Sequence, residues 1–368
     1  MKSLVLLGAA LMINALLALG AEALASAVPA GESTFPLTTV AQYVVNTLLV
    51  GWGVVLAWGR RPPCRVLLVG RGPDSATLRE TLDHHPHYEV AGVLDFATSG
   101  PYLSRWISTE RIRKVVITEP CGVAALPAEA LVECRLAGAR VVDYHAFYET
   151  LYGRLPVTSH LACHLAFARG FDREWATGRI RRALEIVFAL LLLLPAVPLI
   201  LVAALAIKLD SRGSAFYCQD RLGLGGKPYC VWKLRTMVAD AEAEGPRQAT
   251  EEDPRITCVG RILRRLRIDE LPQLWNVVTG EMSLIGPRPE RQCFASELEA
   301  RIPFYRYRTA VKPGITGWAQ VNADYAVSEQ EHREKLEYDL YYLKNQGPWL
   351  DLMILARTVG VVLCGRGR

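Results

Sequence analysis

The sequence predicts an α/β protein with membrane segments: an N-terminal transmembrane hairpin, a doubly wound domain, and a last part that a re-entrant membrane helix opens. Three observations lead to this fold class. Hydrophobic residues make up 51% of the 368 residues and charged residues only 21%, which is too apolar for an ordinary soluble chain of this size. Three apolar stretches are about as long as a membrane helix. Between the second and third stretch, short apolar strands alternate with helical segments.

The first two apolar stretches, residues 3–25 and 40–58, predict a transmembrane hairpin within residues 1–62. Lys and Arg are absent from Ser3 to Gly59 and return at Arg60, so the positive-inside rule places the chain after Arg60 in the cytosol. A cleaved signal peptide is the alternative for the first stretch, because residues 25–27 resemble a small-residue cleavage site.

Residues 63–150 read as a parallel, doubly wound, Rossmann-like domain. Apolar strand segments begin at residues 64, 88, 113 and 139. The first strand runs into a Gly70-x-Gly72 turn, but Ser75 replaces the third glycine of a dinucleotide-binding motif, although Asp95 lies about where an acid would meet a ribose. A fold without a bound dinucleotide is favoured. The absence of a Tyr-xxx-Lys pair argues against a short-chain dehydrogenase, epimerase or dehydratase.

Residues 151–178 are expected to form a connector, and residues 179–368 the last domain. This domain opens with an apolar run at residues 186–207, which is about 33 Å long as a helix. Pro195 and Pro198 stand at its centre and cations flank both ends. A spanning helix would separate the soluble domains, so we expect re-entry; a spanning helix with a proline kink is the alternative.

The nine cysteines form no CxxC pair. His160, Cys163 and His164 are the tightest cluster, with too few ligands for a zinc site. We therefore expect reduced, mostly buried thiols in a cytosolic compartment.

Two adjacent acids, Asp269 and Glu270, follow a basic run formed by Arg261, Arg264, Arg265 and Arg267. One interpretation is structural, with Asp269 capping the helix that begins ELPQLW and Glu270 adding favourable charge to its first turn. The other is chemical. Acids among arginines should have lowered pKa values and be ionised, which suits a nucleophile and a metal ligand.

Further segments favour the chemical interpretation. VWKLRTM carries Lys233 and Arg235, and SLIGPRPE presents Arg288 on a rigid loop. Arg264 and Arg288 can hold a phosphate or diphosphate by bidentate hydrogen bonds, and Lys233 and Arg235 join them as candidate phosphate ligands. A carboxylate-bound divalent ion would neutralise the remaining phosphate charge.

In residues 177–368 the proline-broken run, KLRTM, RRLRIDELPQLWNVVTGEMSLIGPRPE, VKPGITGWAQV and KLEYDLYYLKN closely resemble the bacterial sugar transferases, the monotopic polyprenyl-phosphate glycosyl-1-phosphate transferases. The layout resembles their long form, of the exopolysaccharide type, although long forms usually have about four N-terminal spans and this chain has room for two. The resemblance implies that Asp269 attacks the sugar-linked phosphorus of a UDP-sugar and releases UMP, and that Glu270 holds Mg²⁺. It also implies a break in the re-entrant helix at Pro195. The phospho-sugar would then pass to polyprenyl (undecaprenyl) phosphate, which initiates exopolysaccharide or O-antigen-type glycan synthesis.

The partners implied are a UDP-sugar, polyprenyl phosphate and the lipid bilayer, with a homo-oligomer possible and no nucleic acid expected. The catalytic domain would face the cytoplasm at the bacterial inner membrane. Two alternatives are a nucleotide-sugar dehydratase or epimerase, and a non-catalytic membrane scaffold whose Rossmann-like domain senses a ligand.

Overall fold

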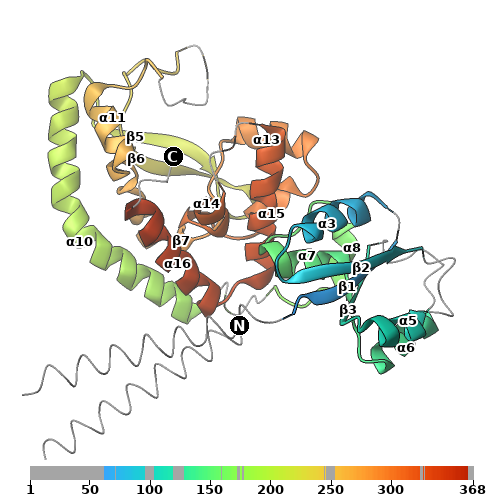
Figure 1. Ribbon diagram of the computed structural model, residues 1–368. Coiled ribbons are helices and arrows are strands. Elements are labelled where there is room, and N and C mark those ends of the chain that lie inside the picture. The colour runs from blue at the N-terminus through green and yellow to red at the C-terminus, as the bar shows by residue number, and fades with distance from the viewer. Residues whose placement is uncertain are drawn as a thin grey trace, which may run out of the picture. The chain divides into compact units, whose positions relative to one another are not determined.

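The computed structural model describes residues 62–70, 72–95, 103–118, 128–158, 160–171, 175, 178–243, 245, 253–323, 326 and 328–363. These residues form two compact units, one ending at Val142 and the other beginning at Asp143 (Figure 1). The transmembrane hairpin predicted within residues 1–62 lies outside the described residues.

The first unit is a parallel sheet with helices in its connections. Its strands are β1 (Cys64–Val69), β2 (Tyr88–Leu94), β3 (Lys114–Ile117) and β4 (Arg140–Asp143), and its helices are α3 (Pro73–Asp83), α5 (Leu103–Glu110) and α6 (Ala128–Leu136). β1 pairs in parallel with both β2 and β3. Val66 to Val69 of β1 are at most 1% exposed, as expected for a strand covered on both faces. The predicted α/β class with a parallel sheet is confirmed.

The strand order in this sheet is β2-β1-β3-β4. The order reverses at β1, which makes the carboxyl end of β1 a topological switch point. It corresponds to the start of the flavodoxin-like order 2-1-3-4-5 rather than to the Rossmann order 3-2-1-4. The helix after β1 begins at Pro73, directly after Gly72, so the predicted glycine turn does join the first strand to the first helix.

The second unit is mainly helical, with two small sheets. β5 and β6 form an antiparallel hairpin, and β7 pairs with β8 in parallel. Its elements are α7 (Tyr144–Tyr152), α8 (Leu161–Phe167), α10 (Arg179–Asp210), β5 (Phe216–Leu222), η2 (Leu224–Gly226), β6 (Pro228–Leu234), α11 (Cys258–Arg265), η3 (Ile268–Glu270), α12 (Gln273–Thr279), β7 (Ser283–Ile285), α13 (Gln292–Arg301), η4 (Tyr305–Ala310), β8 (Gly314–Thr316), α14 (Trp318–Asn322), α15 (Glu329–Asn345) and α16 (Pro348–Leu363).

α10 is one long helix that bends between its two halves (Figure 1). The helix continues through Pro195 and Pro198, so no interruption is present at Pro195. Interior prolines remove backbone donors and bend a helix, which accounts for a curved rather than a straight element. Among the described residues, this is the helix that is long and apolar enough to cross a membrane.

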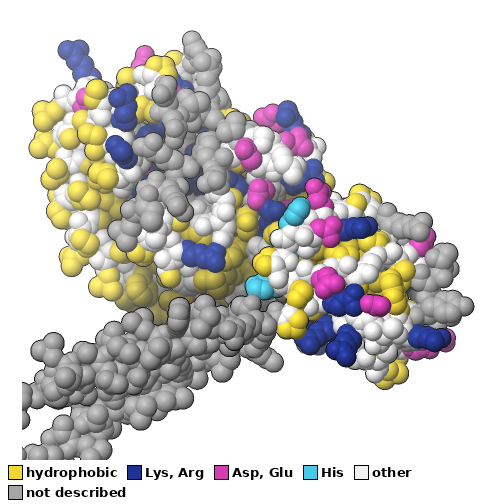
Figure 2. Space-filling view, in the orientation of Figure 1, with side chains coloured by type: hydrophobic (Ala, Val, Ile, Leu, Met, Phe, Trp, Pro, Cys, Tyr) yellow, Lys and Arg dark blue, Asp and Glu magenta, His cyan; other side chains and the backbone are white. Residues whose placement is uncertain are grey.

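One stripe of α10 is buried against the second unit along its whole length. The stripe consists of Arg181, Glu185, Ala189, Ala196, Ile200, Ala203 and Ile207. Its small residues let α12 and α11 approach closely, and Ala189 packs in one core cluster with Val277 and Ile354. The remaining surface of α10 is exposed and hydrophobic, and Figure 2 shows this apolar face along the helix.

The cysteines depart from the expectation of reduced, mostly buried thiols. Cys218 and Cys230 are joined by a disulfide across the β5–β6 hairpin. Of the free cysteines that the structure describes, Cys258 and Cys293 are exposed. The prediction failed because the sequence separation of 12 residues carries no sign of pairing, whereas the antiparallel register brings the two Cα atoms to 5.6 Å.

Candidate active site

The segment that carries the two acids is positioned by α11. Thr257 caps this helix, because its Oγ1 accepts from the backbone N–H of Gly260 at 3.0 Å. A Cβ on Gly260 would lie only 2.0 Å from the carbonyl oxygen of Thr236, so glycine is needed for α11 to pack on the chain that follows β6. This close packing brings Arg264 Nε to 2.8 Å from Thr236 Oγ1.

Asp269 and Glu270 lie in the 3₁₀ turn η3 rather than at the start of a helix. Arg267, with φ of 53°, reverses the chain direction after α11 and leads directly into this turn. The next helix, α12, begins at Gln273, and its N-cap residue is Pro272. The interpretation of Asp269 as a helix cap is therefore wrong, because the turn separates it from the first amides of α12.

Glu270 is held by three cations. Arg288 Nη2 lies 2.8 Å and Lys233 Nζ 3.7 Å from Oε1 of Glu270, and Arg267 Nη1 lies 3.2 Å from Oε2. The Glu270 side chain is only 12% exposed, whereas the side chains of Arg267 and Arg288 still reach water. Lys233 and Arg288, predicted from separate motifs, are thus brought together on one carboxylate.

The carboxylate of Asp269 has no hydrogen bond or ion pair within 4 Å among the described residues, although Lys233, Arg264 and Arg288 act on it electrostatically. The two neighbouring acids are therefore in different states. Glu270 is bound by its surroundings, whereas both oxygens of Asp269 remain available for another partner.

The pKa of Asp269 is raised to about 6, against the expectation of a lowered value. Burial is the largest cause and the negative charge of Glu270 the next, and together they outweigh Lys233, Arg264 and Arg288. The cations are visible in the sequence, whereas the burial of Asp269, which raises its pKa, is not. At neutral pH this carboxyl group is still mostly ionised.

The pKa of Glu270 is lowered, as expected. Burial acts to raise it, but the charges of Arg288, Lys233 and Arg267 exceed that effect. The pKa of Lys233 is itself lowered, to about 8, mainly by burial and then by Arg288. Two adjacent carboxyl groups whose pKa values are pushed apart are typical of sites in which the groups have different roles.

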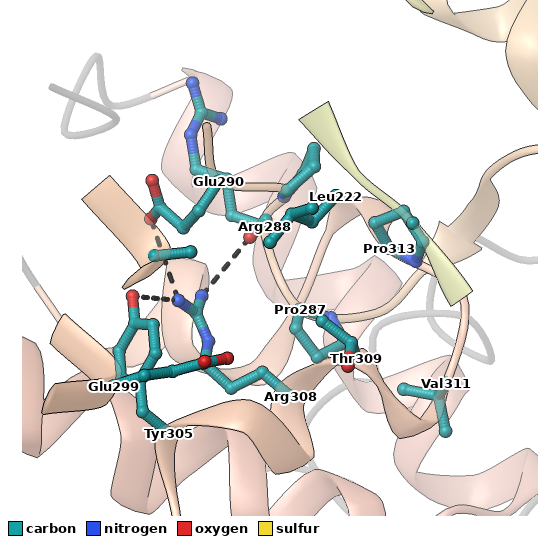
Figure 3. Close-up of a pocket in the computed structure, with 13 residues that line it drawn as sticks. Leu222, Pro287, Arg288, Glu290, Glu299, Tyr305, Arg308, Thr309, Val311 and Pro313 are labelled. Atoms are coloured by element: carbon teal, nitrogen blue, oxygen red, sulfur yellow. Dashed lines mark hydrogen bonds and ion pairs between the residues drawn. The ribbon is translucent and has the colours of Figure 1, made fainter. Parts of the chain in front are cut away.

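Arg288 reaches this site from the loop between β7 and α13. A Cβ on Gly314 would lie 2.0 Å from the backbone nitrogen of Gly286, so the backbones of the two glycines are in direct contact. Gly314 N–H donates to the carbonyl of Pro287 at 2.9 Å. Arg308 lies beneath the same loop and donates to the carbonyl of Arg288 (Figure 3).

Arg264 and Arg235, two of the predicted phosphate ligands, form hydrogen bonds to other groups than the two acids. Arg264 makes its hydrogen bond to Thr236 and acts on Asp269 through its charge. The guanidinium of Arg235 donates to the backbone carbonyls of Ser211 and Arg212 at the carboxyl end of α10. The structure therefore does not bring Arg235 into contact with the Asp269–Glu270 pair.

Arg267 is part of the basic run that precedes the two acids, but its contact with Glu270 was not predicted. Its spacing from Glu270 is three residues, which is a recognised ion-pair distance only if the segment is helical. Arg308 was missed as well, because nothing in the local sequence links it to the loop of Arg288.

Asp143, His145 and His164 form a second cluster of potential metal ligands. The rings of His145 and His164 are stacked, at 4.9 Å and 17°, so their in-plane lone pairs do not converge on one point. Lys344 Nζ also lies 3.5 Å from Nε2 of His164. We assign no metal to this cluster, and instead regard Asp143 as the cap of α7, where its Oδ1 accepts from Ala146 N–H at 3.1 Å.

Comparison with known proteins identifies the class. The family profile described as bacterial sugar transferase matches residues 176–365, which include every predicted site residue. The chain belongs to the bacterial sugar transferase family, and the resemblance stated from the sequence motifs is confirmed.

Similar curated proteins carry more specific names. The chain is 40% identical over 237 residues to the UDP-N-acetylgalactosamine-undecaprenyl-phosphate N-acetylgalactosaminephosphotransferase of Aeromonas hydrophila, covering 64% of this chain and 55% of that protein. It is 42% identical over 182 residues to the UDP-glucose:undecaprenyl-phosphate glucose-1-phosphate transferase of Escherichia coli (strain K12), covering 49% of this chain and 39% of that protein. A protein of the same name from Caulobacter vibrioides is 45% identical over 185 residues, covering 50% of this chain and 69% of that protein. The chain thus spans about half the length of the first two relatives.

Proposed function

We propose that the protein transfers a sugar-1-phosphate from a UDP-sugar to undecaprenyl phosphate and releases UMP. The observation that carries this proposal is the unequal state of two adjacent acids. Asp269 has no partner among the residues that the structure describes, whereas Glu270 is held by Lys233, Arg267 and Arg288. An unpaired, mostly ionised carboxylate beside a cluster of cations is suited to attack a phosphorus atom whose oxygens those cations bind. The relatives' names support a UDP-sugar donor and an undecaprenyl phosphate acceptor.

The reaction proceeds in two displacements. An Oδ atom of Asp269 bonds to the sugar-linked phosphorus, the bond from that phosphorus to the bridging oxygen breaks, and UMP leaves. A phosphate oxygen of undecaprenyl phosphate then bonds to the same phosphorus and the aspartyl oxygen leaves. The product is an undecaprenyl diphosphate-linked sugar, and Asp269 returns as a free carboxylate. Lys233, Arg264 and Arg288 bind the phosphate oxygens and hold the phosphorus in line with Asp269.

A divalent cation, Mg²⁺ in our proposal, fits this site only together with the diphosphate. Glu270 offers the oxygen ligands that Mg²⁺ prefers. However, the two acids are surrounded by four cations, Lys233, Arg264, Arg267 and Arg288. These side chains together carry net positive charge and would repel a free metal ion. When bound, the ion would neutralise charge on the diphosphate and its leaving group. We expect binding of the metal and of UDP to reinforce each other.

The helix α10 supports a membrane location on one face only. Near its start, Arg182 Nη1 donates to the carbonyl of Val277 at 2.7 Å, and at its end Asp210 Oδ2 accepts from Val259 N–H at 3.2 Å. Both ends are thus fixed to one compact unit, and the buried stripe runs between them. Lipid can surround such a helix on its apolar side only, so we propose that α10 enters and leaves the same, cytoplasmic, face of the bacterial inner membrane.

We also propose a doubly wound domain over residues 63–150, with the flavodoxin-like strand order in place of the Rossmann order, and an N-terminal hairpin. The parallel sheet and its switch point at β1 support a doubly wound domain. The relatives' names include both UDP-N-acetylgalactosamine and UDP-glucose, so the donor test covers both kinds of sugar.

The decisive experiment is UMP release from UDP-glucose, UDP-galactose and their N-acetylated counterparts, with undecaprenyl phosphate as acceptor. With labelled UDP-sugar and no acceptor, the protein itself should become labelled. We expect Asp269→Asn to abolish both signals, and Glu297→Gln, which changes an exposed carboxylate paired with Arg301, to leave both intact. Full turnover by Asp269→Asn would rule out the nucleophile, and absence of UMP release with every donor would favour the non-catalytic scaffold.

A further inference from the structure

Arg308 is a buried arginine whose guanidinium contacts other groups of the protein. Its Nε donates to Oδ2 of Asp339 on α15 at 2.7 Å, and both side chains are at least nine-tenths buried. Nη1 donates to the hydroxyl of Tyr305 and lies 3.7 Å from Oε1 of Glu290. Such a buried pair is costly to break, because removal of one partner leaves an uncompensated charge.

The remaining nitrogen of Arg308 contacts the loop that carries the site arginine. Nη2 donates to the backbone carbonyl of Arg288 at 3.2 Å, and Figure 3 shows the guanidinium lying between that carbonyl, Tyr305 and Glu290. The loop has prolines at 287 and 289, which offer no N–H. The loop therefore has few N–H groups of its own, and it is not part of a sheet or helix at this point. Its carbonyls need donors from other segments of the chain.

The opposite flank of the loop is fixed in the same way. Arg221 Nη1 donates to the carbonyl of Pro289 at 3.1 Å, and Leu222 N–H donates to the carbonyl of Glu290 at 2.9 Å. Arg308 connects the carbonyl of Arg288 itself to α15. The side chain of Arg288 leaves the loop from that residue and ends on Glu270, so the position of its backbone determines where the guanidinium can reach.

We propose that Arg308 is a positioning residue, which transmits the rigidity of α15 through Asp339 to the backbone of Arg288 and so places the Arg288 guanidinium at the reacting phosphate. This inference rests on the proposed function. Arg308 touches neither substrate nor Asp269; it acts through Arg288. A displacement of about 1 Å at a positioning group can lower a rate about 100-fold, so a small shift of the loop is enough for a large effect.

The test is a double-mutant cycle on purified, full-length protein with UMP release as the readout. Arg308→Lys keeps a positive charge beside Asp339. Its single ammonium group lacks the planar guanidinium and cannot donate to all three hydrogen-bond partners of Arg308 at once. We expect its kcat to fall about 10-fold to 100-fold, with a smaller change in KM for the UDP-sugar. In an Arg288→Met background, Arg308→Lys should cost no further activity, because the group that it positions is gone.

Arg291→Lys is the matched control. Arg291 follows the same loop, but its guanidinium binds Glu242 at 2.7 and 2.9 Å and no carbonyl of the loop. If Arg308→Lys does not fold, Asp339→Asn decides, because it weakens, at almost unchanged volume, the contact through which α15 fixes Arg308. A kcat within about twofold of the wild type, or a loss that is additive with Arg288→Met, overturns the inference. A wild type that releases no UMP would instead overturn the proposed function.

Discussion

Arg288 Nη2 lies 2.8 Å from Oε1 of Glu270, a residue 18 positions earlier in another sequence motif. This contact joins the RIDELPQ turn to the GPRP loop, and leaves the neighbouring Asp269 without a partner in the described part of the chain. The consequences of this contact for activity and for its pH dependence can each be measured.

The loss of the Arg288 guanidinium should reduce catalysis more than it reduces folding. We expect Arg288→Met to lower kcat/KM for the UDP-sugar about 100-fold to 1,000-fold, because a preorganised donor to the phosphate is removed. Arg301→Met is the control, since Arg301 is exposed and pairs with Glu297, away from the two acids. The measurement is UMP release together with the thermal transition of each variant. A variant that retains wild-type kcat/KM would exclude Arg288 from phosphate binding.

Activity should depend on pH in a bell-shaped manner. Asp269, with its pKa raised to about 6, must lose its proton to act as a nucleophile, so kcat/KM rises as the pH passes through about 6. Lys233, with its pKa lowered to about 8, must keep its proton to bind phosphate, so kcat/KM falls above about 8. Lys233→Arg retains the charge at higher pH and should move only the alkaline limb upward. An alkaline limb that does not move in this variant would show that another group titrates.

Both ends of α10 should be accessible from one side of the membrane. We expect cysteines introduced at Gly178 and at Ser214 to react with an impermeant thiol reagent in inside-out vesicles and not in right-side-out vesicles. The exposed native Cys258 provides the internal standard for the face that carries the catalytic residues. A cysteine at Leu191, on the exposed apolar face of α10, should be shielded by lipid in both preparations. Labelling of positions 178 and 214 from opposite sides would establish a spanning helix.

Asp143 should stabilise the second unit in a pH-dependent manner. Asp143→Ala removes the cap of α7, which should cost about 1 kcal/mol of the free energy of unfolding, and Asp143→Asn should cost less because Asn also caps. Burial acts to raise the pKa of Asp143, but His164 and the Ala146 amide lower it to about 2. A carboxyl group with a lowered folded-state pKa stabilises above its unfolded pKa of about 4, and this stabilisation is lost as the pH falls towards 2. Denaturation of the variant and the wild type should therefore converge in that range.

The sequence anticipated much of the chemistry but not its geometry. Asp269, Glu270, Lys233, Arg264 and Arg288 could be selected because acids beside cations in several motifs indicate phosphate chemistry. Arg235 was selected by the same reasoning, yet its hydrogen bonds are made to the end of α10. Residue type predicts what a side chain can bind, whereas the direction in which it points depends on the packing of its strand.

The sequence by itself determined that this chain has a long apolar helix containing two prolines, alternating strands and helices, and the motifs of the bacterial sugar transferases. These features depend on composition and on periodicity along the chain, which are local properties. Only the tertiary structure decided which of the two acids is free and which is bound, that the pKa of Asp269 is raised, and that Arg308 lies beneath Arg288. Burial, charge and hydrogen bonding at one point sum contributions from residues distant in sequence, so only the folded chain defines them.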